Sequence, residues 1–244
     1  MQIFKKTNML TDLEFHYCPG CTHGIIHRLI AECIEELGQG DHCIGVAPVG
    51  CAVLAYDYFN CDMQEAPHGR APALATGIKR VRPDALVFTY QGDGDLASIG
   101  AAEIVHAAAR GELFTTIFVN NAIYGMTGGQ MAPTTLIGQA ASTSPFGRDP
   151  LTHGRPINMA EMLAVLDGVA FIERVSVFDV KAIKHAKKAI QKAFTFQIEK
   201  KGFTMIEILS TCPTNWRMHP LDAIKWAEEK MTAQFPLGIM KEVV

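Results

Sequence analysis

Residues 85–95 read ALVFTYQGDGD, a largely apolar run that ends in alternating glycines and aspartates. The apolar part predicts a buried strand, and the glycines predict a sharp turn after it. The small-residue segment Ser98–Arg110 predicts a helix, and Phe114–Val119 predicts a second strand that runs into the pair Asn120-Asn121. A strand, a helix and a strand in this order are typical of a parallel sheet, so both strands should end at the same edge.

The residues of this unit favour a bound anion together with a metal ion. The glycines let backbone N–H groups approach an anion closely, and the start of the next helix adds a favourable dipole. Asp93 and Asn121 carry hard oxygen donors, which Mg2+ prefers, and Mg2+ keeps bound phosphates in its shell. We interpret the unit as a site for a diphosphate held through a divalent cation. The alternative is a tight turn whose acidic residues only cap the helix.

The rest of the chain alternates in the same way, which predicts an α/β fold. We expect a mostly parallel sheet with helices on both faces. Further helices are predicted over Gly24–Leu37, Gly69–Arg80, Ile157–Leu166, Val180–Lys200 and Leu221–Met231, and further strands over Cys43–Val46, Val169–Val175 and Phe203–Leu209.

Ligands of such sheets bind beyond the carboxyl ends of the strands. Gly92, Asn120 and Cys212 each follow a predicted strand, so we expect them to converge at one edge. A Gly-, Pro- and Thr-rich loop runs from Asn120 to about Pro156. This loop is too long to be a mere connection, which indicates a functional role.

Composition and charge exclude several classes of protein. The 244 residues contain no linker or repeat, so we expect a single domain over 1–244, with an N-terminal CxxC segment and a C-terminal tail helix. The net charge is −3, and the basic cluster Lys181–Lys201 has the spacing of a solvated helix face, which argues against nucleic acid as a partner. No apolar run reaches the ~18 residues of a membrane span. Because Met1–Lys6 lacks a hydrophobic signal segment, we expect a cytoplasmic protein.

Seven cysteines in a reducing compartment are more often metal ligands or core residues than disulfides. Four of them follow tight turns or a strand end and would suit a 4Fe–4S cluster or a structural zinc ion. Cys33 and Cys43 have core spacing, and Cys61 is the main rival as fourth ligand. The favoured set is Cys18, Cys21, Cys51 and Cys212.

The Gly-Asp-Gly and Asn-Asn pair resembles the thiamine diphosphate motif, in which the aspartate, the second asparagine and a backbone carbonyl two residues later bind the metal. Those residues are Asp93, Asn121 and Ile123 here. From about residue 15 to 215 the chain resembles the thiamine-diphosphate-binding beta subunit of the 2-oxoacid:ferredoxin oxidoreductases. The resemblance is carried, in order, by Cys18-Pro19-Gly20-Cys21, Gly50-Cys51, His68-Gly69-Arg70, Gly92-Asp93-Gly94-Asp95, Asn120-Asn121, Tyr124-Gly125-Met126-Thr127-Gly128-Gly129-Gln130 and Ser210-Thr211-Cys212-Pro213.

The resemblance implies three cofactors: thiamine diphosphate, Mg2+ and one 4Fe–4S cluster on the four favoured cysteines. It implies oxidative decarboxylation of a 2-oxoacid, with transfer of the acyl group to coenzyme A and of the electrons to ferredoxin. His68 and Arg70 are the candidate catalytic residues, because either suits a substrate carboxylate near the reacting ring. Further cofactor contacts are expected from Gly50, Cys51, Gly92, Gly94, Asp95, Leu96, Gly125, Met126, Thr127 and Gln130.

Thiamine enzymes need a carboxylate that activates the aminopyrimidine of the cofactor. Gln64-Glu65 is a possible local source, but the resemblance implies a glutamate from another subunit. We therefore expect a chain that is inactive alone and works with alpha, and gamma or delta, subunits. Of the nearby histidines, His27 is expected on a helix surface and His23 closer to the CxxC cysteines.

The sequence gives only a weak indication of the acid specificity. Some 2-oxoglutarate-type relatives carry a lysine where this chain has Gly128-Gly129, and a second substrate carboxylate would need such a cation. A branched-chain acid such as 2-oxoisovalerate is therefore favoured over 2-oxoglutarate or pyruvate. Two other classes stay open: a non-redox thiamine diphosphate decarboxylase subunit, which needs no cluster, and a zinc-binding module, which needs no Gly-Asp-Gly-Asp turn.

Overall fold

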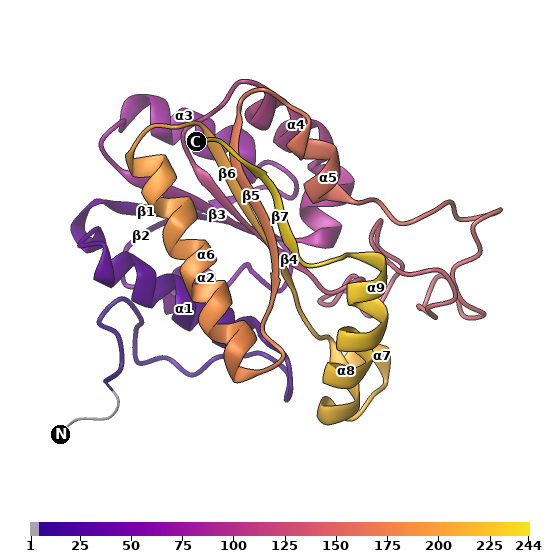
Figure 1. The fold of residues 1–244 in the computed structure, drawn as a ribbon. Helices are drawn as coiled ribbons and strands as arrows, with labels where there is room; N and C mark the ends of the chain where they lie inside the picture. The colour runs from indigo at the N-terminus through magenta and orange to yellow at the C-terminus, as the bar shows by residue number, and fades with distance from the viewer. Residues whose placement is uncertain (1–4) are drawn as a thin grey trace.

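The computed structural model describes residues 5–244. Residues 1–4, which belong to the segment in which no signal sequence is expected, lie outside the described residues. These residues build one sheet of seven strands in the order β2-β1-β3-β4-β6-β5-β7 (Figure 1). All neighbouring strands run parallel except β7, which pairs antiparallel with β5. The strands are β1 Cys43–Pro48, β2 Asp62–Ala66, β3 Leu86–Gly92, β4 Thr115–Asn120, β5 Val169–Ser176, β6 Phe203–Leu209 and β7 Gly238–Glu242.

Helices cover both faces of the sheet, which confirms the predicted fold class. The long helices α1 and α6 pack on one face, and α3, α4 and α5 pack on the other (Figure 1). The helices are α1 His23–Glu36, α2 Ala55–Tyr58, α3 Ala71–Val81, α4 Ala101–Ala109, α5 Met159–Ala164, α6 Val180–Ile198, α7 Pro213–Trp216, α8 Pro220–Trp226 and α9 Thr232–Gln234; Gly40–His42 forms a 3-10 turn, and Asp95–Ile99 and Ala227–Met231 form π-helical turns.

Strand β3 shows why the sheet forms here. Its side chains alternate between the two layers: Leu86, Phe88 and Tyr90 join the core under α1 and α6, while Val87 joins the core under α3 and α4. A strand that is buried on both faces reads as a continuous apolar run, because neither face meets water. The apolar stretch that begins at residue 85 is therefore a central strand of a parallel sheet.

Two strands have no counterpart in the predicted set. The edge strand β2 is mostly polar and largely exposed, so it lacks the apolar signature of the central strands. The other edge strand, β7, is also partly exposed and lies after the last predicted element, the helix Leu221–Met231. The helix expected from Ser98 begins at Ala101, because Asp95–Ile99 forms a π-helical turn first. Edge strands carry weak sequence signals because one side of each has no partner.

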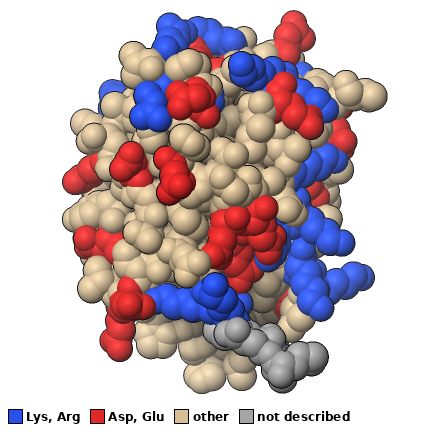
Figure 2. All heavy atoms as spheres, turned by 90° about the vertical axis from the view of Figure 1, so that its left-hand side faces the viewer, with Lys and Arg blue, Asp and Glu red and all other residues tan. Residues whose placement is uncertain are grey.

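The basic helix α6 is amphipathic, as its spacing predicts. Its apolar residues are buried against the sheet, and two of its lysines pair with acidic side chains. Lys187 contacts both Glu32 and Glu36 of α1, and Lys192 contacts Glu242 of β7. Figure 2 accordingly shows lysine, arginine and acidic side chains in mixed groups on this side of the molecule. Within residues 5–244, no helix is both long and apolar enough to cross a membrane.

The long loop between β4 and α5 extends away from the sheet (Figure 1). One buried arginine holds it together: the Arg148 guanidinium donates to the backbone carbonyls of six loop residues. A guanidinium has five N–H donors in a fixed plane, which suits such a hub. The six acceptors are the carbonyls of Ala132, Pro133, Thr135, His153, Gly154 and Arg155.

We expect Arg148→Ala to lower the free energy of unfolding by about 2–4 kcal/mol, because buried carbonyls then lose a charged donor. Urea denaturation followed by circular dichroism measures this loss. Arg155→Ala is the matched control, since Arg155 lies exposed in the same loop. Equal losses in the two variants would contradict the role given to Arg148.

Candidate active site

The carboxyl ends of β3, β4 and β6 lie side by side, as predicted. Gly92 pairs with Val119, and Asn120 pairs with Leu209, so the segments that follow these strands meet at one edge of the sheet. A cavity of about 390 Å³ opens at this edge. It is lined by His23, Val49, Gly50, Cys51, Ala52, His68, Gly92, Asp93, Gly94, Asp95, Asn121, Ile123, Tyr124, Gly125, Met126, Thr127 and Gln130.

Every predicted cofactor contact except Leu96 lines this cavity. The Leu96 side chain is buried in the hydrophobic core under α3 and α4, so only its backbone is left for a ligand. Four lining residues are additions to the predicted set: His23, Val49, Ala52 and Tyr124.

Asp93 lies almost fully buried at the floor of the cavity. Its Oδ2 accepts a hydrogen bond of 2.5 Å from Thr134 Oγ1, and its Oδ1 accepts one of 2.8 Å from the Gly94 N–H. Burial raises the pKa of Asp93 to about 7, although these hydrogen bonds act in the opposite direction. A buried carboxylate without a countercharge is costly, which is the environment that a bound cation relieves.

Thr134 is missing from the predicted site. It lies in the long loop, and nothing in its spacing from Asp93 links the two residues. The loop folds back so that Thr135 donates to the Ala122 carbonyl while Thr134 reaches Asp93. The long loop therefore contacts a residue of the cavity lining through Thr134.

The two asparagines after β4 have different environments. Asn120 is buried and donates to Glu207, which also accepts from Arg174, so it belongs to an internal polar network. Asn121 lines the cavity, where its Oδ1 accepts from the Ile123 N–H at 3.3 Å. Ala122, which follows Asn121, has φ of +56°, a left-handed conformation that turns the chain at this point.

Asp93, Asn121 and the Ile123 backbone supply one carboxylate, one amide oxygen and one carbonyl oxygen beside the cavity. Hard oxygen donors of mixed charge are the set that Mg2+ takes when phosphates and water complete its shell. The residues present therefore fit a Mg2+ ion with a bound diphosphate.

Two glycines are required by close packing around the cavity. A Cβ added at Gly94 would lie 2.3 Å from the Tyr124 ring, inside any van der Waals contact. A Cβ at Gly125 would lie 3.1 Å from Cys51 Sγ and 3.6 Å from Cys212 Sγ. At Gly125 the cavity wall is therefore a single stretch of backbone, and the sulfurs of Cys51 and Cys212 lie directly beside it.

The candidate catalytic residues His68 and Arg70 separate in space. His68 lines the cavity, and its Nδ1 lies 2.6 Å from Asp95 Oδ1. Arg70 lies outside the cavity lining and pairs with Glu103 of α4, because it stands one position before α3 and faces the neighbouring helix. Its observed contacts tie α3 to α4 and include no group of the cavity.

Asp95 also differs from the sequence interpretation. Its Oδ1 accepts from the Gly69 N–H as well as contacting His68, and its Oδ2 accepts from Gln91 Nε2, each at 2.6 Å. Both carboxylate oxygens are therefore committed to protein groups. A diphosphate is also anionic, so a direct contact with this carboxylate would be repulsive.

Thr127 and Gln130 close the outer rim of the cavity. Thr127 Oγ1 donates to Gln130 Oε1 at 2.6 Å, and Gln130 Nε2 donates back to the Thr127 carbonyl at 2.9 Å. The two side chains thus hold a compact turn at the cavity, and successive backbone amides of such turns are suited to binding anions.

The four favoured cysteines lie together around a second, smaller cavity of about 60 Å³. Burial raises the pKa of Cys21 to about 12 and that of Cys51 to about 11, and it also raises the pKa of Cys212. Thiols in such surroundings stay neutral until a metal replaces their protons. Asn215 Nδ2 donates to Cys212 Sγ at 3.3 Å, a contact that suits a metal-bound thiolate.

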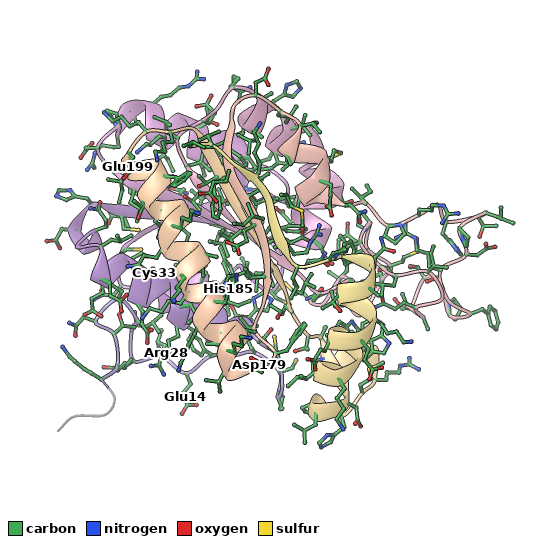
Figure 3. All side chains as sticks on the ribbon, viewed as in Figure 1. Glu14, Arg28, Cys33, Asp179, His185 and Glu199 are labelled. Carbon is green, nitrogen blue, oxygen red and sulfur yellow. The ribbon has the colours of Figure 1, made fainter. Side chains whose placement is uncertain are left out.

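The other cysteines are separate from this group. Cys33 lies between α1 and α6, with its Sγ 3.4 Å from the Lys187 carbonyl (Figure 3). Cys43 and Cys61 interact with each other at the amino ends of β1 and β2, the edge opposite to the cavities. Cys61 is therefore placed at the wrong edge of the sheet for a fourth ligand.

Within residues 5–244, no three His, Cys, Asp or Glu side chains converge closely enough to hold a single metal ion. This geometry disfavours a structural zinc ion, which draws four ligands onto one centre. A 4Fe–4S cluster makes a different demand, because each thiolate binds a different iron atom of a larger body. The four-cysteine cavity therefore fits the cluster better than the zinc ion.

A ring of histidines and aromatic side chains surrounds the CxxC segment. His27 is fully buried there, which corrects the expectation of a helix-surface residue. Its Nε2 lies 2.5 Å from the Tyr17 hydroxyl, and the rings of Phe59 and Tyr90 pack around it. An imidazole at a buried helix position has no apolar spacing signal, so the sequence pattern could not separate it from a surface histidine.

The buried histidines predict loss of stability in acid. Burial holds the pKa of His27 well below 6.5, so below that pH the unfolded chain binds a proton that the folded chain excludes. The contribution of neutral His27 to the free energy of unfolding is thus fully present above pH 6.5. It falls by about 1.4 kcal/mol for each pH unit below that value. Asp93 acts with the opposite sign, because its pKa is raised to about 7.

Comparison of the wild-type chain with His27→Gln isolates this contribution, since Asp93 affects both proteins equally. Both proteins are unfolded with denaturant at pH 7.5, 6.5 and 5.5. The free energy of unfolding of the variant should rise relative to that of the wild-type chain as the pH falls. Parallel pH dependences in the two proteins would contradict a neutral, buried His27.

Known proteins match most of the length of this chain. The family model for the thiamine pyrophosphate enzyme C-terminal TPP binding domain matches residues 40–208. Ketoisovalerate oxidoreductase subunit VorA of Methanothermobacter thermautotrophicus is 49% identical over 235 residues, which cover 96% of this chain and 49% of that protein. The chain therefore spans about half the length of the VorA relatives it matches.

Two further matches extend over most of both partners. The 2-oxoglutarate synthase subunit KorB of Methanocaldococcus jannaschii is 38% identical over 220 residues, which cover 87% of this chain and 77% of that one. A 2-oxoglutarate:ferredoxin oxidoreductase from Magnetococcus marinus, solved with 2-oxoglutarate, coenzyme A and succinyl-CoA bound, superposes with a TM-score of 0.81 at 25% identity, covering 100% of this chain and 87% of that chain. With its cavity at the end of β3 and β4, the chain therefore belongs to the family of thiamine-pyrophosphate-binding beta subunits of the 2-oxoacid:ferredoxin oxidoreductases.

Proposed function

We propose that this chain is the subunit in which a 2-oxoacid:ferredoxin oxidoreductase decarboxylates its substrate and passes the electrons to an iron–sulfur cluster. One observation carries the proposal: the larger cavity and the four-cysteine cavity share a wall. The wall is made by His23, Cys51, Asn121 and Gly125, which line both cavities. Electrons released on one side of such a wall have a short path to an acceptor on the other.

In the larger cavity, Asp93, Asn121 and the Ile123 carbonyl would hold Mg2+, and the turns after Gly92 and Tyr124 would cradle the diphosphate of thiamine diphosphate. The bound cofactor supplies the electron sink for decarboxylation, which is its own chemistry. The protein orients the cofactor, keeps the site largely apolar and holds protons at defined atoms. Thr134 positions the Asp93 carboxylate through its 2.5 Å hydrogen bond.

In the smaller cavity, Cys18, Cys21, Cys51 and Cys212 would hold one 4Fe–4S cluster. The convergence of the four cysteines on one small cavity supports this assignment. Because burial raises the pKa of Cys21, Cys51 and Cys212, these thiols would lose their protons on binding a metal. A cluster accepts electrons singly, so it links a two-electron decarboxylation to ferredoxin, which we propose as the final acceptor.

The active enzyme needs at least one partner subunit. Asp93 and Asp95 are the carboxylates in the cavity lining within residues 5–244. Asp93 is assigned to Mg2+, and Asp95 accepts hydrogen bonds from Gly69 and Gln91 and contacts His68. Glu65 lies on the exposed edge strand β2 and lines no part of this cavity. We therefore propose that the glutamate that activates the aminopyrimidine comes from an alpha subunit, and that gamma or delta subunits complete the complex.

We propose a branched-chain 2-oxoacid such as 2-oxoisovalerate as the substrate and coenzyme A as the acyl acceptor. Within residues 5–244, no lysine or arginine lines the cavity, so a second substrate carboxylate would be unpaired unless a partner supplied the cation. The 49% identity with a ketoisovalerate oxidoreductase subunit supports the same choice. The KorB relatives keep 2-oxoglutarate as the second candidate.

A cytoplasmic location fits this assignment, since all seven cysteines are free thiols and a cluster requires a reducing compartment.

The test is an anaerobic assay of the chain co-expressed with the subunits encoded beside it. Coenzyme A-dependent reduction of a viologen dye is followed with 2-oxoisovalerate, 2-oxoglutarate and pyruvate in parallel, with iron and sulfide analysis. We expect dye reduction with 2-oxoisovalerate and about four iron atoms per chain. Iron-free protein that still releases carbon dioxide would instead assign the chain to the non-redox decarboxylases.

A further inference from the structure

Three groups surround the carboxylate of Asp95 and link it to the active-site cavity. His68 Nδ1 and the Gly69 N–H both lie 2.6 Å from Oδ1, and Gln91 Nε2 lies 2.6 Å from Oδ2. Asp95 and Gln91 are almost completely buried, whereas the His68 side chain is about one-third exposed, at 34%. The chain of contacts therefore runs from the buried end of β3 to an imidazole in the cavity lining.

The direction of the hydrogen bonds follows from the groups that can only donate or only accept. The Gly69 amide can only donate, so Oδ1 accepts from it. Gln91 presents its amide nitrogen to Oδ2, because the reverse orientation would set two oxygens against each other. With the Gly69 amide donating to Oδ1 and Gln91 donating to Oδ2, we assign Asp95 as the acceptor of the proton on His68 Nδ1 as well.

This pattern determines the state of the other imidazole nitrogen. In a neutral ring only one nitrogen carries a proton, and the partner of Nδ1 decides which one. With Nδ1–H held by Asp95, Nε2 carries a lone pair. Within residues 5–244, no hydrogen bond to His68 Nε2 is found, although His68 lines the cavity. Nε2 is thus left as an acceptor for a group bound there.

We propose that Asp95, anchored by Gln91 and the Gly69 amide, is a positioning residue that fixes His68 as a proton acceptor towards the cavity. This inference rests on the proposed function and deepens it. When a reactant loses a hydroxyl or thiol proton, the O–H or S–H bond breaks, its electron pair stays on oxygen or sulfur, and the proton forms the Nε2–H bond. The Asp95 carboxylate then faces an imidazolium, which it stabilises.

The hydroxyl and the thiol are two sources of the same proton, and the half-reactions separate them. Release of carbon dioxide from the 2-oxoacid without coenzyme A involves no thiol. Coenzyme A-dependent dye reduction involves both steps. If His68 accepts the thiol proton, its substitution will slow only the coenzyme A-dependent dye reduction. If His68 accepts a hydroxyl proton, its substitution will slow both reactions.

The test uses the complete complex with 15N-histidine in this chain, the three single variants Asp95→Ala, Asp95→Asn and His68→Gln, and the double variant that combines Asp95→Ala with His68→Gln. We expect the His68 signals, assigned by their loss in His68→Gln, to show a protonated Nδ1 and a bare Nε2 in the wild-type protein, and the opposite or a mixture in Asp95→Ala. We expect Asp95→Ala and His68→Gln each to lower kcat by about 100-fold or more with little change in KM. The double variant should be no slower than His68→Gln alone.

Asp95→Asn keeps an oxygen that accepts from Nδ1 and Gly69, and Gln91 can turn its oxygen towards the new amide. We therefore expect this variant to keep the wild-type tautomer and part of the lost activity. Glu173→Gln is a matched control, because Glu173 Oε1 lies 2.6 Å from His185 Nε2 in a second histidine–carboxylate pair remote from the cavity. It should leave the turnover unchanged.

The inference is overturned if Asp95→Ala leaves the His68 tautomer unchanged, or leaves kcat unchanged. It is also overturned if Asp95→Ala loses thiamine diphosphate or iron in proportion to activity, because Asp95 would then act on the cofactors themselves. A wild-type complex that turns over no 2-oxoacid but shows the tautomer shift would reject the proposed function and leave the positioning of His68 intact.

Discussion

Asp93→Asn is expected to abolish Mg2+-dependent binding of thiamine diphosphate and, with it, turnover by the assembled enzyme. The substitution keeps the shape of the side chain and removes its charge, so the cation loses its anionic protein ligand. Loss of a hydrogen-bond partner behind a ligand already costs about 10–100-fold in affinity, so loss of the ligand charge should cost at least about 100-fold. Calorimetric titration of the variant with thiamine diphosphate and Mg2+ measures the effect.

The same substitution should stabilise the chain in the absence of cofactor. Because burial raises the pKa of Asp93 to about 7 from an ordinary 3.8, the folded state pays for an ionised carboxylate above pH 7. The penalty grows as the pH rises from 3.8 to 7 and reaches up to about 4 kcal/mol at pH 8. The neutral amide of the Asp93→Asn variant carries no such penalty. Higher stability together with lost binding is the signature of a residue kept for function.

Two further variants sharpen the test. Thr134→Val removes only the 2.5 Å hydrogen bond to Asp93, so we expect an intermediate loss of affinity, of about 10-fold. Asp167→Asn is the matched control, because Asp167 is exposed and lies outside the cavity lining. If Asp93→Asn bound the cofactor as tightly as Asp167→Asn, the metal site would have to lie elsewhere.

The site residues that the sequence predicts well are those tied to strand ends. Asp93 and Asn121 follow buried strands with strong apolar signals, and the parallel pairing of β3 with β4 brings them together without further information. The same logic brings Cys212 to this edge through β6. In a parallel sheet the topology decides most of the placement, because every carboxyl end lies on one side.

Sequence reasoning does not reveal the tertiary contacts of several residues in and around the site. Thr134 reaches Asp93 only because a long loop folds back on itself, and loop paths have no periodic signal. Arg70 shares a motif with His68, yet one residue beyond the turn it faces α4 rather than the cavity. Asp95 was interpreted as a cofactor contact because the spacing of acidic residues does not reveal which partners use their oxygens.

Cys212→Ser is expected to remove most of the iron from the purified complex and to stop electron transfer to the dye. The wild-type chain should carry about four iron atoms, each bound in part by one of the four thiolates. Serine oxygen is a harder and weaker ligand for this cluster, so one substitution opens it to solvent and loss. Iron and sulfide analysis, with the visible absorbance of anaerobic protein, measures the result.

The matched control is Cys61→Ser, which changes the same chemical group at the opposite edge of the sheet. Cys61 contacts Met63 and Cys43 there, so its substitution should leave iron content and dye reduction unchanged. Thiamine diphosphate binding separates the two cavities further. Since Asp93 and Asn121 stay in place, Cys212→Ser should still bind the cofactor, and any remaining release of carbon dioxide should no longer be coupled to the dye. Equal iron loss in the Cys61 and Cys212 variants would reject the assigned cluster ligands, because one cluster cannot reach both edges of the sheet.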